Sequence, residues 1–140
     1  MADEIVLREC QTSDIEQVLE MWQAAETNAS STDASQYLQI AIDSSASYFI
    51  LAESGGRIAG SLIGTFDGWR GEMYRMAVHP DFRRRGLARR LAAEAERWMV
   101  EQGAKRITAL VEREHPWATG FWEAAGYDLD PGMARYARDL

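Results

Sequence analysis

Residues 72–111 limit the possible folds of this chain more than any other segment. A strand-like run over residues 72–78 is stopped by Pro80, because proline has no N–H to donate to a strand ladder. An amphipathic pattern then predicts a long helix over residues 86–101, and Gly103 is typical of its end. The apolar run at residues 107–111 predicts a buried strand. A strand, a crossover helix and a second strand favour two parallel strands in one sheet.

The helix over residues 86–101 is expected to bury one apolar face. Its positions are Leu87, Leu91, Ala95 and Trp98, with Ala88, Ala92 and Met99 beside them. Ser13 and Glu16 form a candidate capping box for an earlier helix that carries Ile15, Val18, Leu19 and Trp22. A second early helix is expected to carry Tyr37, Leu38, Ala41 and Ile42.

Turn signals divide the rest of the chain into short strands and one further helix. Ser54-Gly55-Gly56 predicts a hairpin, and Asp67-Gly68-Trp69-Arg70-Gly71 predicts a second turn. Strands are expected at residues 5–10, 48–52, Arg57–Phe66, 127–129 and 135–138, and a helix at residues 117–125 that ends at Gly126. The predicted fold class is therefore a mixed α/β sandwich.

Size and composition indicate one globular domain over residues 1–140, with 46% hydrophobic residues to form a core. Cys10 is the only cysteine, so no disulfide can form within the chain. No apolar stretch approaches the roughly 20 residues needed to cross a bilayer. Residues 1–4 lack the basic and apolar pattern of a signal peptide. We expect a cytoplasmic protein with no membrane partner.

The positive charge of this acidic chain is concentrated at one place. The net charge is −7, yet five of the fifteen Lys and Arg residues lie between Arg83 and Arg90. A nucleic-acid-binding domain usually has a pI above about 9, whereas the pI of this chain is about 4.8. The arginines therefore favour a small polyanion over a nucleic acid. The alternative is an arginine-rich helix face that is simply solvated.

The predicted position of these arginines supports phosphate binding. They precede a helix N-terminus, where unpaired N–H groups and the positive end of the helix dipole attract anions. Gly86 allows close approach of the backbone to a pyrophosphate, and Ala88 keeps the next turn small. Arg83, Arg84, Arg85 and Arg89 can add charge-assisted hydrogen bonds. The chain has neither the P-loop ending nor the dinucleotide-binding glycine pattern.

These residues resemble the cofactor motif of the GNAT superfamily of N-acetyltransferases. The resemblance includes Val78 and Pro80 before the loop, and Arg83-x-x-Gly86-x-Ala88 within it. It extends to Ala118 with the segment Phe121-Trp122-Glu123-Ala124-Ala125-Gly126-Tyr127, which is similar to a second pattern of the family. The element order also agrees over nearly the whole chain.

The resemblance implies a mostly antiparallel sheet flanked by helices, with a central, splayed parallel strand pair. Residues 1–140 would be one N-acetyltransferase domain. Acetyl-CoA would be the cosubstrate, and no metal would be needed. The family's cofactor site corresponds here to Met76, Ala77, Val78, Arg83, Arg84, Arg85, Gly86, Leu87, Ala88 and Arg89, with His115 as a further candidate. One N–H of residues 76–78 would polarise the acetyl carbonyl.

Glu72 is the catalytic candidate, as the base that deprotonates the amine. Strand alternation would place it on the same face as Tyr74, Met76 and Val78, and some GNAT enzymes have a glutamate here. The alternative is an exposed carboxylate at the end of a strand. Glu112 and Glu114 are weaker candidates, which could attract a cationic substrate.

Two positions depart from the family pattern. Trp122 stands where a tyrosine often protonates the departing thiolate, so Tyr127, Tyr136 or Tyr74 would replace it or the thiolate would leave unassisted. His115 stands where the family often has asparagine. It could bind the pantetheine arm or act as a base, or it could be a helix cap or surface residue.

The resulting prediction is direct acetyl transfer from acetyl-CoA to an amine of a small molecule or a peptide. The alternative is a non-catalytic module that binds or senses acyl-CoA. The chain could also form a homodimer, as many GNAT proteins do.

Overall fold

The computed structural model describes residues 4–140, without the side chains of residues 116 and 117. The chain is divided into two compact units, Met1–Leu110 and Val111–Leu140. The first contains a five-stranded sheet in the order β1-β2-β3-β4-β5. Its strands are β1 (Ile5–Glu9), β2 (Ser47–Ser54), β3 (Arg57–Phe66), β4 (Gly71–Val78) and β5 (Ile107–Ala109). Pairing is antiparallel except between β4 and β5, which are parallel.

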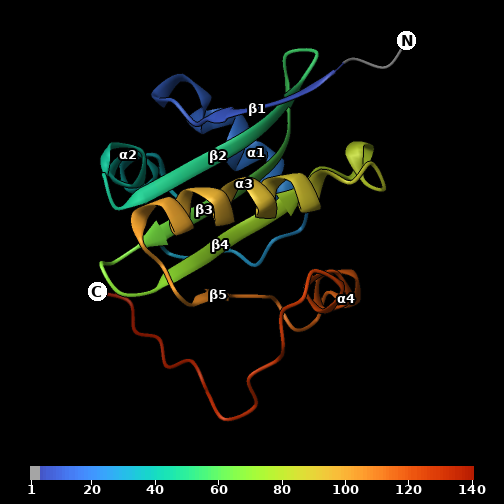
Figure 1. Ribbon diagram of the computed structural model, residues 1–140. Helices are drawn as coiled ribbons and strands as arrows, with labels where there is room; N and C mark the ends of the chain where they lie inside the picture. Colours follow the sequence, from blue (N-terminus) through green and yellow to red (C-terminus); the bar gives the residue numbers. More distant parts are fainter. Residues whose placement is uncertain (1–3) are drawn as a thin grey trace. The chain divides into compact units, whose positions relative to one another are not determined.

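Helices cover both faces of this sheet (Figure 1). The long helix α3 (Leu87–Gln102) lies across one face, and α1 (Ile15–Ala24) lies on the other, with α2 (Ser35–Asp43) packed on β2. The short 3-10 turns are η1 (Thr12–Asp14) and η2 (Pro80–Phe82). This mixed, mostly antiparallel sheet with a crossover helix and a central parallel pair confirms the predicted fold class.

Each face of the sheet has its own core. Toward α3, the strand residues Ile50, Leu62 and Met73 are almost completely buried. The helix contributes Leu87, Leu91, Ala92, Ala95 and Met99 to this layer. The core on the other face is formed by Cys10, Ile15, Val18, Met21, Trp22, Ala25, Leu38, Phe49, Leu51, Ile58 and Ala77. The amphipathic patterns predicted for the helices α1 and α3 are confirmed. Trp98 is only half-buried, and its ring centroid lies 5.5 Å from that of Tyr48.

The predicted capping box of Ser13 and Glu16 is wrong. The carboxylate of Asp14 instead accepts the N–H of Gln11 at 2.8 Å and also binds both terminal nitrogens of Arg8 at 2.7 and 2.9 Å. This ion pair holds the pKa of Asp14 below its usual range, chiefly through the hydrogen bonds from Arg8. Arg8, in β1, thus fixes the Asp14 carboxylate at the start of the helix. A pattern within the helix sequence does not include this strand residue, and so it does not predict the contact.

The second unit contains α4 (Pro116–Ala124), with Ala118 and Trp122 buried. Gly126 follows this helix with φ 94°, as expected of a helix end. The two strands predicted at 127–129 and 135–138 are wrong, because residues 127–140 form no strand. Leu129, Met133 and Tyr136 are 74%, 72% and 96% exposed, so this segment has no buried face to stabilise pairing. β5 is also shorter than predicted, and its three residues are half-buried.

Candidate active site

The parallel strands β4 and β5 separate soon after they pair. Their ladder joins Gly71 to Ile107 and ends with Met73 and Ala109, after which Leu110 donates its N–H to the Met73 carbonyl at 3.1 Å. β4 continues to Val78. One edge of β4 is therefore left open beyond Met73 within the first unit, as the prediction of a splayed pair requires.

Backbone groups at the end of β4 point to this open edge. His79 donates its N–H to the Ala59 carbonyl at 2.8 Å, so His79 faces β3. Alternation then turns the N–H and C=O of Ala77 toward β3, and those of Met76 and Val78 toward the open edge. The side chain of Ala77 is buried in the core. Of these three predicted residues, Met76 and Val78 are the ones whose backbone groups face this edge, and the Val78 carbonyl accepts a hydrogen bond from Arg83 Nε.

The alternation used to place Glu72 is interrupted by a bulge. Tyr74 pairs with Ile63 and Ala77 pairs with Ser61, so Arg75 and Met76 together lie opposite one residue of β3. Because directly paired residues share a face, Glu72 and Tyr74 lie on the same face as Ala77, and Val78 lies on the face toward α3. The expectation that Glu72 shares a face with Val78 is therefore wrong.

Glu72 nevertheless has an arrangement suited to a base. The Tyr74 hydroxyl donates a hydrogen bond of 2.8 Å to Glu72 Oε2. Both residues are half-buried, beside the point where the β4–β5 ladder ends. The hydrogen bond orients the carboxylate, and Oε1 is the other oxygen that can accept a proton. Sequence reasoning named both residues but not this contact.

An aromatic anchor shapes the loop between β4 and α3. Phe82 is buried, and the guanidinium groups of Arg57 and Arg85 lie 4.9 and 5.3 Å from its ring centroid. Arg57 also pairs with Asp81 at 2.8 Å, and this hydrogen bond lowers the pKa of the Asp81 carboxyl. Arg83 donates through Nε to the Val78 carbonyl at 3.3 Å. The loop is thus tied to the strand that precedes it.

The same loop places a cationic surface around a helix N-terminus. Arg84 and Gly86 adopt the left-handed region, with φ 65° and 72°. Arg90 N–H makes a bond of 3.2 Å to the Gly86 carbonyl, so the N–H groups of residues 87–89 belong to the first helical turn and lack intrahelical partners. A Cβ at Gly86 would meet no atom within 4 Å.

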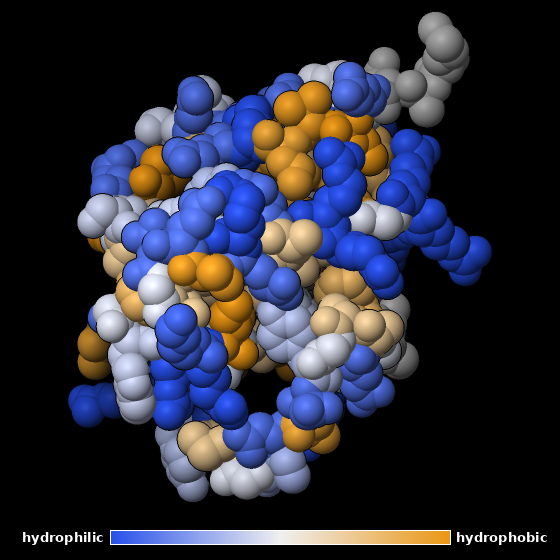
Figure 2. All heavy atoms as spheres, in the orientation of Figure 1, coloured by the Kyte–Doolittle hydropathy of each residue, from blue (hydrophilic) through white to orange (hydrophobic). Residues whose placement is uncertain are grey.

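The predicted cofactor residues differ in how far they reach solvent. Leu87 is buried and anchors the helix, and Ala88 is half-buried. The exposed members are Arg83, Arg84, Arg85, Gly86 and Arg89. Hydrophilic side chains project over this loop, on the right of the view in Figure 2. The surface combines exposed guanidinium groups with unpaired N–H donors, which is an arrangement suited to phosphate.

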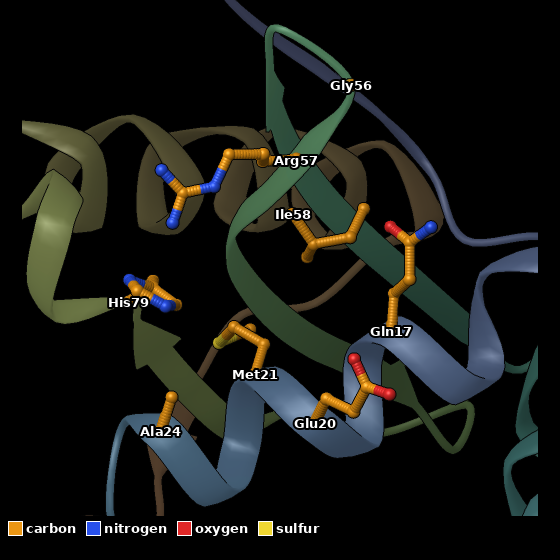
Figure 3. Close-up of a pocket in the computed structure, with 8 residues that line it drawn as sticks. All are labelled: Gln17, Glu20, Met21, Ala24, Gly56, Arg57, Ile58 and His79. Carbon is orange, nitrogen blue, oxygen red and sulfur yellow. The ribbon is translucent and has the colours of Figure 1, made fainter.

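The first unit has a hollow between α1 and the start of β3, away from the open edge of β4 (Figure 3). It is lined by Gln17, Glu20, Met21, Ala24, Gly56, Arg57, Ile58 and His79. His79 accepts the Asp81 N–H at Nδ1, at 3.1 Å. None of the predicted site residues lines this hollow.

His115 and Trp122 belong to the second unit. His115 is the residue before α4, and its Nε2 lies 2.7 Å from Glu112 Oε2. The cap position favours its interpretation as a helix-boundary residue. Trp122 is 6% exposed, with ring centroids 5.1 Å from Phe121 and 5.0 Å from Tyr127. Trp122 therefore serves as a packing residue of this unit, and Tyr136 is almost fully exposed.

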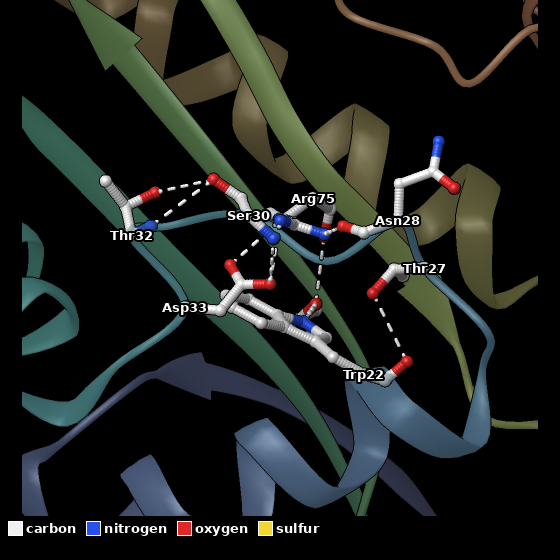
Figure 4. A network of polar contacts seen from close by, with 8 residues as sticks. Trp22, Thr27, Asn28, Ser30, Thr32, Asp33 and Arg75 are labelled. Carbon is white, nitrogen blue, oxygen red and sulfur yellow. Dashed lines mark hydrogen bonds and ion pairs between the residues drawn. The ribbon is translucent and has the colours of Figure 1, made fainter. Parts of the chain in front are cut away.

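Sequence reasoning missed the polar network around Arg75 (Figure 4). Arg75 binds Asp33 and the Asn28 carbonyl, and Ser61 joins its backbone to Trp22. An arginine within a strand pattern is the only local signal, and it does not reveal the bulge. Within residues 4–140, no group of three His, Cys, Asp or Glu side chains could hold a metal ion. No helix in this described part is long and apolar enough to span a membrane.

Known proteins share both the sequence pattern and the fold. The sequence profile of the Acetyltransferase (GNAT) family matches residues 15–127. Acetyltransferase YE1169 of Yersinia enterocolitica is 30% identical over 122 residues, which cover 87% of this chain and 86% of that protein.

Solved structures agree in fold at low sequence identity. Aminoglycoside N-acetyltransferase AAC(6')-Iy in complex with CoA has a TM-score of 0.79 and 16% identity, over 100% of this chain and 98% of the other. The PaiA N-acetyltransferase of Thermoplasma acidophilum in complex with coenzyme A has a TM-score of 0.79 and 17% identity, over 91% of each chain. With the splayed strand pair and the cationic helix N-terminus already in place, these matches assign the chain to the acetyltransferase (GNAT) family, of which it is a member.

Proposed function

We propose that this protein transfers an acetyl group from acetyl-CoA to a primary amine of a small molecule or peptide. The observation that carries the proposal is the open edge of β4, which leads directly to the cationic N-terminus of α3. A ligand with an extended amide-containing arm and a pyrophosphate matches both features. Two of the similar folds belong to N-acetyltransferases in complex with CoA, which supports the choice of this cosubstrate.

The arm would pair with the open edge as an added strand does. Met76 and Val78 present backbone groups there, and the Val78 carbonyl is already bound by Arg83. The N–H groups of residues 87–89 and the exposed arginines would bind the pyrophosphate. A backbone N–H of Met76 at this edge would stabilise the oxyanion of the tetrahedral intermediate.

The amine would attack the acetyl carbon directly. Glu72 would accept a proton from the amine, with Tyr74 orienting its carboxylate. The C–N bond forms first and gives the tetrahedral intermediate, whose collapse restores the carbonyl and breaks the C–S bond, so that CoA leaves as a thiolate. A thiol pKa of about 8.5 means that departure near neutral pH needs little assistance from an acid. The buried Trp122 at the family's tyrosine position is consistent with this unassisted departure.

The first test is binding and turnover with the wild-type protein. CoA affinity is measured by calorimetry, and thiol release from acetyl-CoA is followed with aminoglycosides, polyamines and lysine peptides as acceptors. We expect CoA binding and turnover of at least one amine. Binding without turnover across the panel would favour the alternative, a non-catalytic acyl-CoA-binding module. Trp122 supports this alternative, because it stands where the family often has its acid tyrosine.

The second test concerns Glu72. We expect Glu72→Gln to lower kcat/KM by about 10²- to 10⁴-fold, the usual contribution of a general base. The loss should shrink at a pH where the amine is already neutral in solution. Glu101→Gln is the control, because Glu101 is an exposed carboxylate on α3 that pairs with Arg97. A Glu72→Gln protein with wild-type activity would place the base elsewhere.

We further propose that residues 1–140 act as one N-acetyltransferase domain, in the cytoplasm. Met1–Leu110 contains the strand edge and the phosphate loop, and α4 in the second unit contains the family's downstream pattern. Neither of these proposals requires a homodimer, a metal or a nucleic acid. Gel filtration with light scattering would decide the oligomeric state.

A further inference from the structure

The bulge in β4 has an unusual backbone conformation. Arg75 has φ 55°, in the left-handed region that residues with a Cβ adopt at a cost. Such a conformation persists when the surrounding structure holds it in place. Two separate sets of contacts converge on Arg75, one on its carbonyl and one on its side chain (Figure 4).

The carbonyl of Arg75 is bound from the core. Ser61 Oγ donates to it at 2.9 Å, and the same oxygen accepts the Trp22 indole N–H at 2.8 Å. Ser61 is 0% exposed and Trp22 is 3% exposed. Because the Ser61 hydroxyl accepts from Trp22 and donates to Arg75, these two hydrogen bonds connect α1 through β3 to the bulge and hold it in one orientation.

The side chain of Arg75 binds the loop between α1 and α2, residues 25–34, which we call the 25–34 loop. Nη2 contacts both carboxylate oxygens of Asp33, at 2.8 and 3.0 Å, and Nη1 donates to the Asn28 carbonyl at 2.8 Å. The guanidinium also lies 4.9 Å from the ring centroid of Trp22. The Arg75 and Asp33 side chains are 17% and 20% exposed, so water screens this pair less than an ordinary surface pair.

The position of this loop matters because α3 covers one face of the sheet. A Cβ at Gly60 would lie 3.2 Å from Leu87 and Leu91, which shows how closely that face is packed. The proposed base Glu72 lies on the opposite face, so we assign the attacking amine to that face. Glu72 and Tyr74 lie on that face, and Arg75 attaches the 25–34 loop to the same stretch of strand.

We propose that Arg75 is a positioning residue, which latches the 25–34 loop to β4 so that the loop forms a wall of the acceptor site. This proposal rests on the acetyl transfer proposed above. The latch is expected to affect the acceptor and not acetyl-CoA, because its contacts lie on the acceptor face of the bulge. Its two ends are the Asp33 carboxylate and the Arg75 guanidinium.

The test uses variants that separate the side chain from the backbone. Arg75→Gly removes the guanidinium but keeps φ 55° accessible, because glycine adopts this region freely. Asp33→Asn breaks the ion pair from the loop side, and Arg75→Lys keeps the charge but loses the two-pronged geometry. The control is Glu101→Gln, which breaks an ion pair on α3.

Two measurements follow for each variant. Amide hydrogen exchange of the 25–34 loop is measured on the free, full-length protein. Steady-state kinetics with acetyl-CoA and a panel of an aminoglycoside, a polyamine and a lysine peptide give separate KM values for acetyl-CoA and the acceptor. For Arg75→Gly and Asp33→Asn we expect faster loop exchange and an acceptor KM raised by about 10- to 100-fold. The KM for acetyl-CoA should stay within twofold, and Arg75→Lys should be intermediate.

The proposal is overturned if Arg75→Gly and Asp33→Asn, both folded, retain the loop exchange and the acceptor KM of the wild type. An equal rise in the KM of acetyl-CoA would also overturn it, because that result indicates a general structural defect. If the wild type turns over none of the three amines, the proposed function fails by itself. Loop exchange then decides the latch, since unchanged exchange in Arg75→Gly refutes it.

Discussion

Two glycines at opposite ends of α3 allow a controlled test of the proposal that the loop Arg83–Ala88 binds the pyrophosphate of CoA. Gly86 precedes the helix with φ 72°, and Gly103 follows it with φ 110°. A Cβ at either position would meet no atom within 4 Å. Alanine therefore creates backbone strain without a clash at both positions, about 1–2 kcal/mol at Gly86 and at least as much at Gly103, whose φ lies farther from the left-handed minimum. We expect both variants to be folded, with Tm lowered by roughly 3–8 °C.

CoA binding should distinguish the two variants. Only Gly86 adjoins the N–H groups of residues 87–89, where the pyrophosphate is proposed to bind. A Cβ there would separate the phosphate from at least one donor. One charge-assisted hydrogen bond contributes about 1.5–3 kcal/mol, which corresponds to roughly 10- to 150-fold in Kd. Gly86→Glu adds a like charge next to the phosphates and is expected to abolish binding.

Calorimetric titration with CoA and thermal unfolding of the same samples give both quantities. The expected pattern is a loss of Tm in both alanine variants, at least as large in Gly103→Ala, with loss of CoA affinity in Gly86→Ala alone. Equal CoA affinity in the two alanine variants, or unchanged affinity in Gly86→Glu, would refute the assignment of the pyrophosphate to this loop.

Three further predictions concern stability and reactivity. Because Arg8 lowers the pKa of Asp14, this carboxylate stabilises the fold above its unfolded pKa, and the contribution is lost as pH falls through the lower folded value. Asp14→Asn should therefore lower the unfolding free energy at pH 7 by about 1.5–3 kcal/mol and flatten its fall in acid, and an unaltered acid transition in urea denaturation would contradict this. Burial raises the pKa of the Cys10 thiol to about 12, and the residue is 4% exposed. It should react with a thiol reagent at pH 8 only after unfolding, and rapid labelling of the native protein would count against the buried position. Gly71→Ala would place its Cβ 2.4 Å from a buried methionine sulfur, whereas Gly64→Ala meets its nearest atoms at 3.5 Å. Thermal denaturation should show a loss of about 1–3 kcal/mol for the first and little change for the second, and equal stabilities would exclude the clash.

The short-range features of this protein could be predicted because their causes are local. Pro80 cannot donate an N–H to a β-ladder, so a strand is expected to end before it in any fold. Gly86 and Gly103 likewise permit a left-handed conformation at a helix boundary. The 3.6-residue period of α3 required one buried face, and Leu87, Leu91, Ala95 and Met99 form it. The crossover helix then made the parallel β4–β5 pair the expected arrangement.

Features that depend on a partner in another helix, strand or loop were not predictable. The helix start is organised by Asp14, and Arg8 of β1 secures that choice. The pattern at residues 127–140 resembled strands, yet a strand needs the edge of a neighbouring strand to pair with. This segment pairs with none of the strands β1 to β5. Tertiary pairing, and not alternation, decides whether an apolar pattern becomes a strand.

The sequence by itself determined which chemical groups surround the proposed phosphate site, since Arg83–Arg85, Gly86 and the helix N-terminus are consecutive in the chain. Only the tertiary structure decided which face each β4 side chain occupies. Arg75 inserts one extra residue opposite β3 and reverses the alternation, so Glu72 and Val78 lie on different faces. The reversal depends on Ser61, Trp22 and Asp33, which come from β3, α1 and the 25–34 loop. A bulge held by three separate segments leaves no periodic signal in the strand itself, because its cause lies in the packing around it.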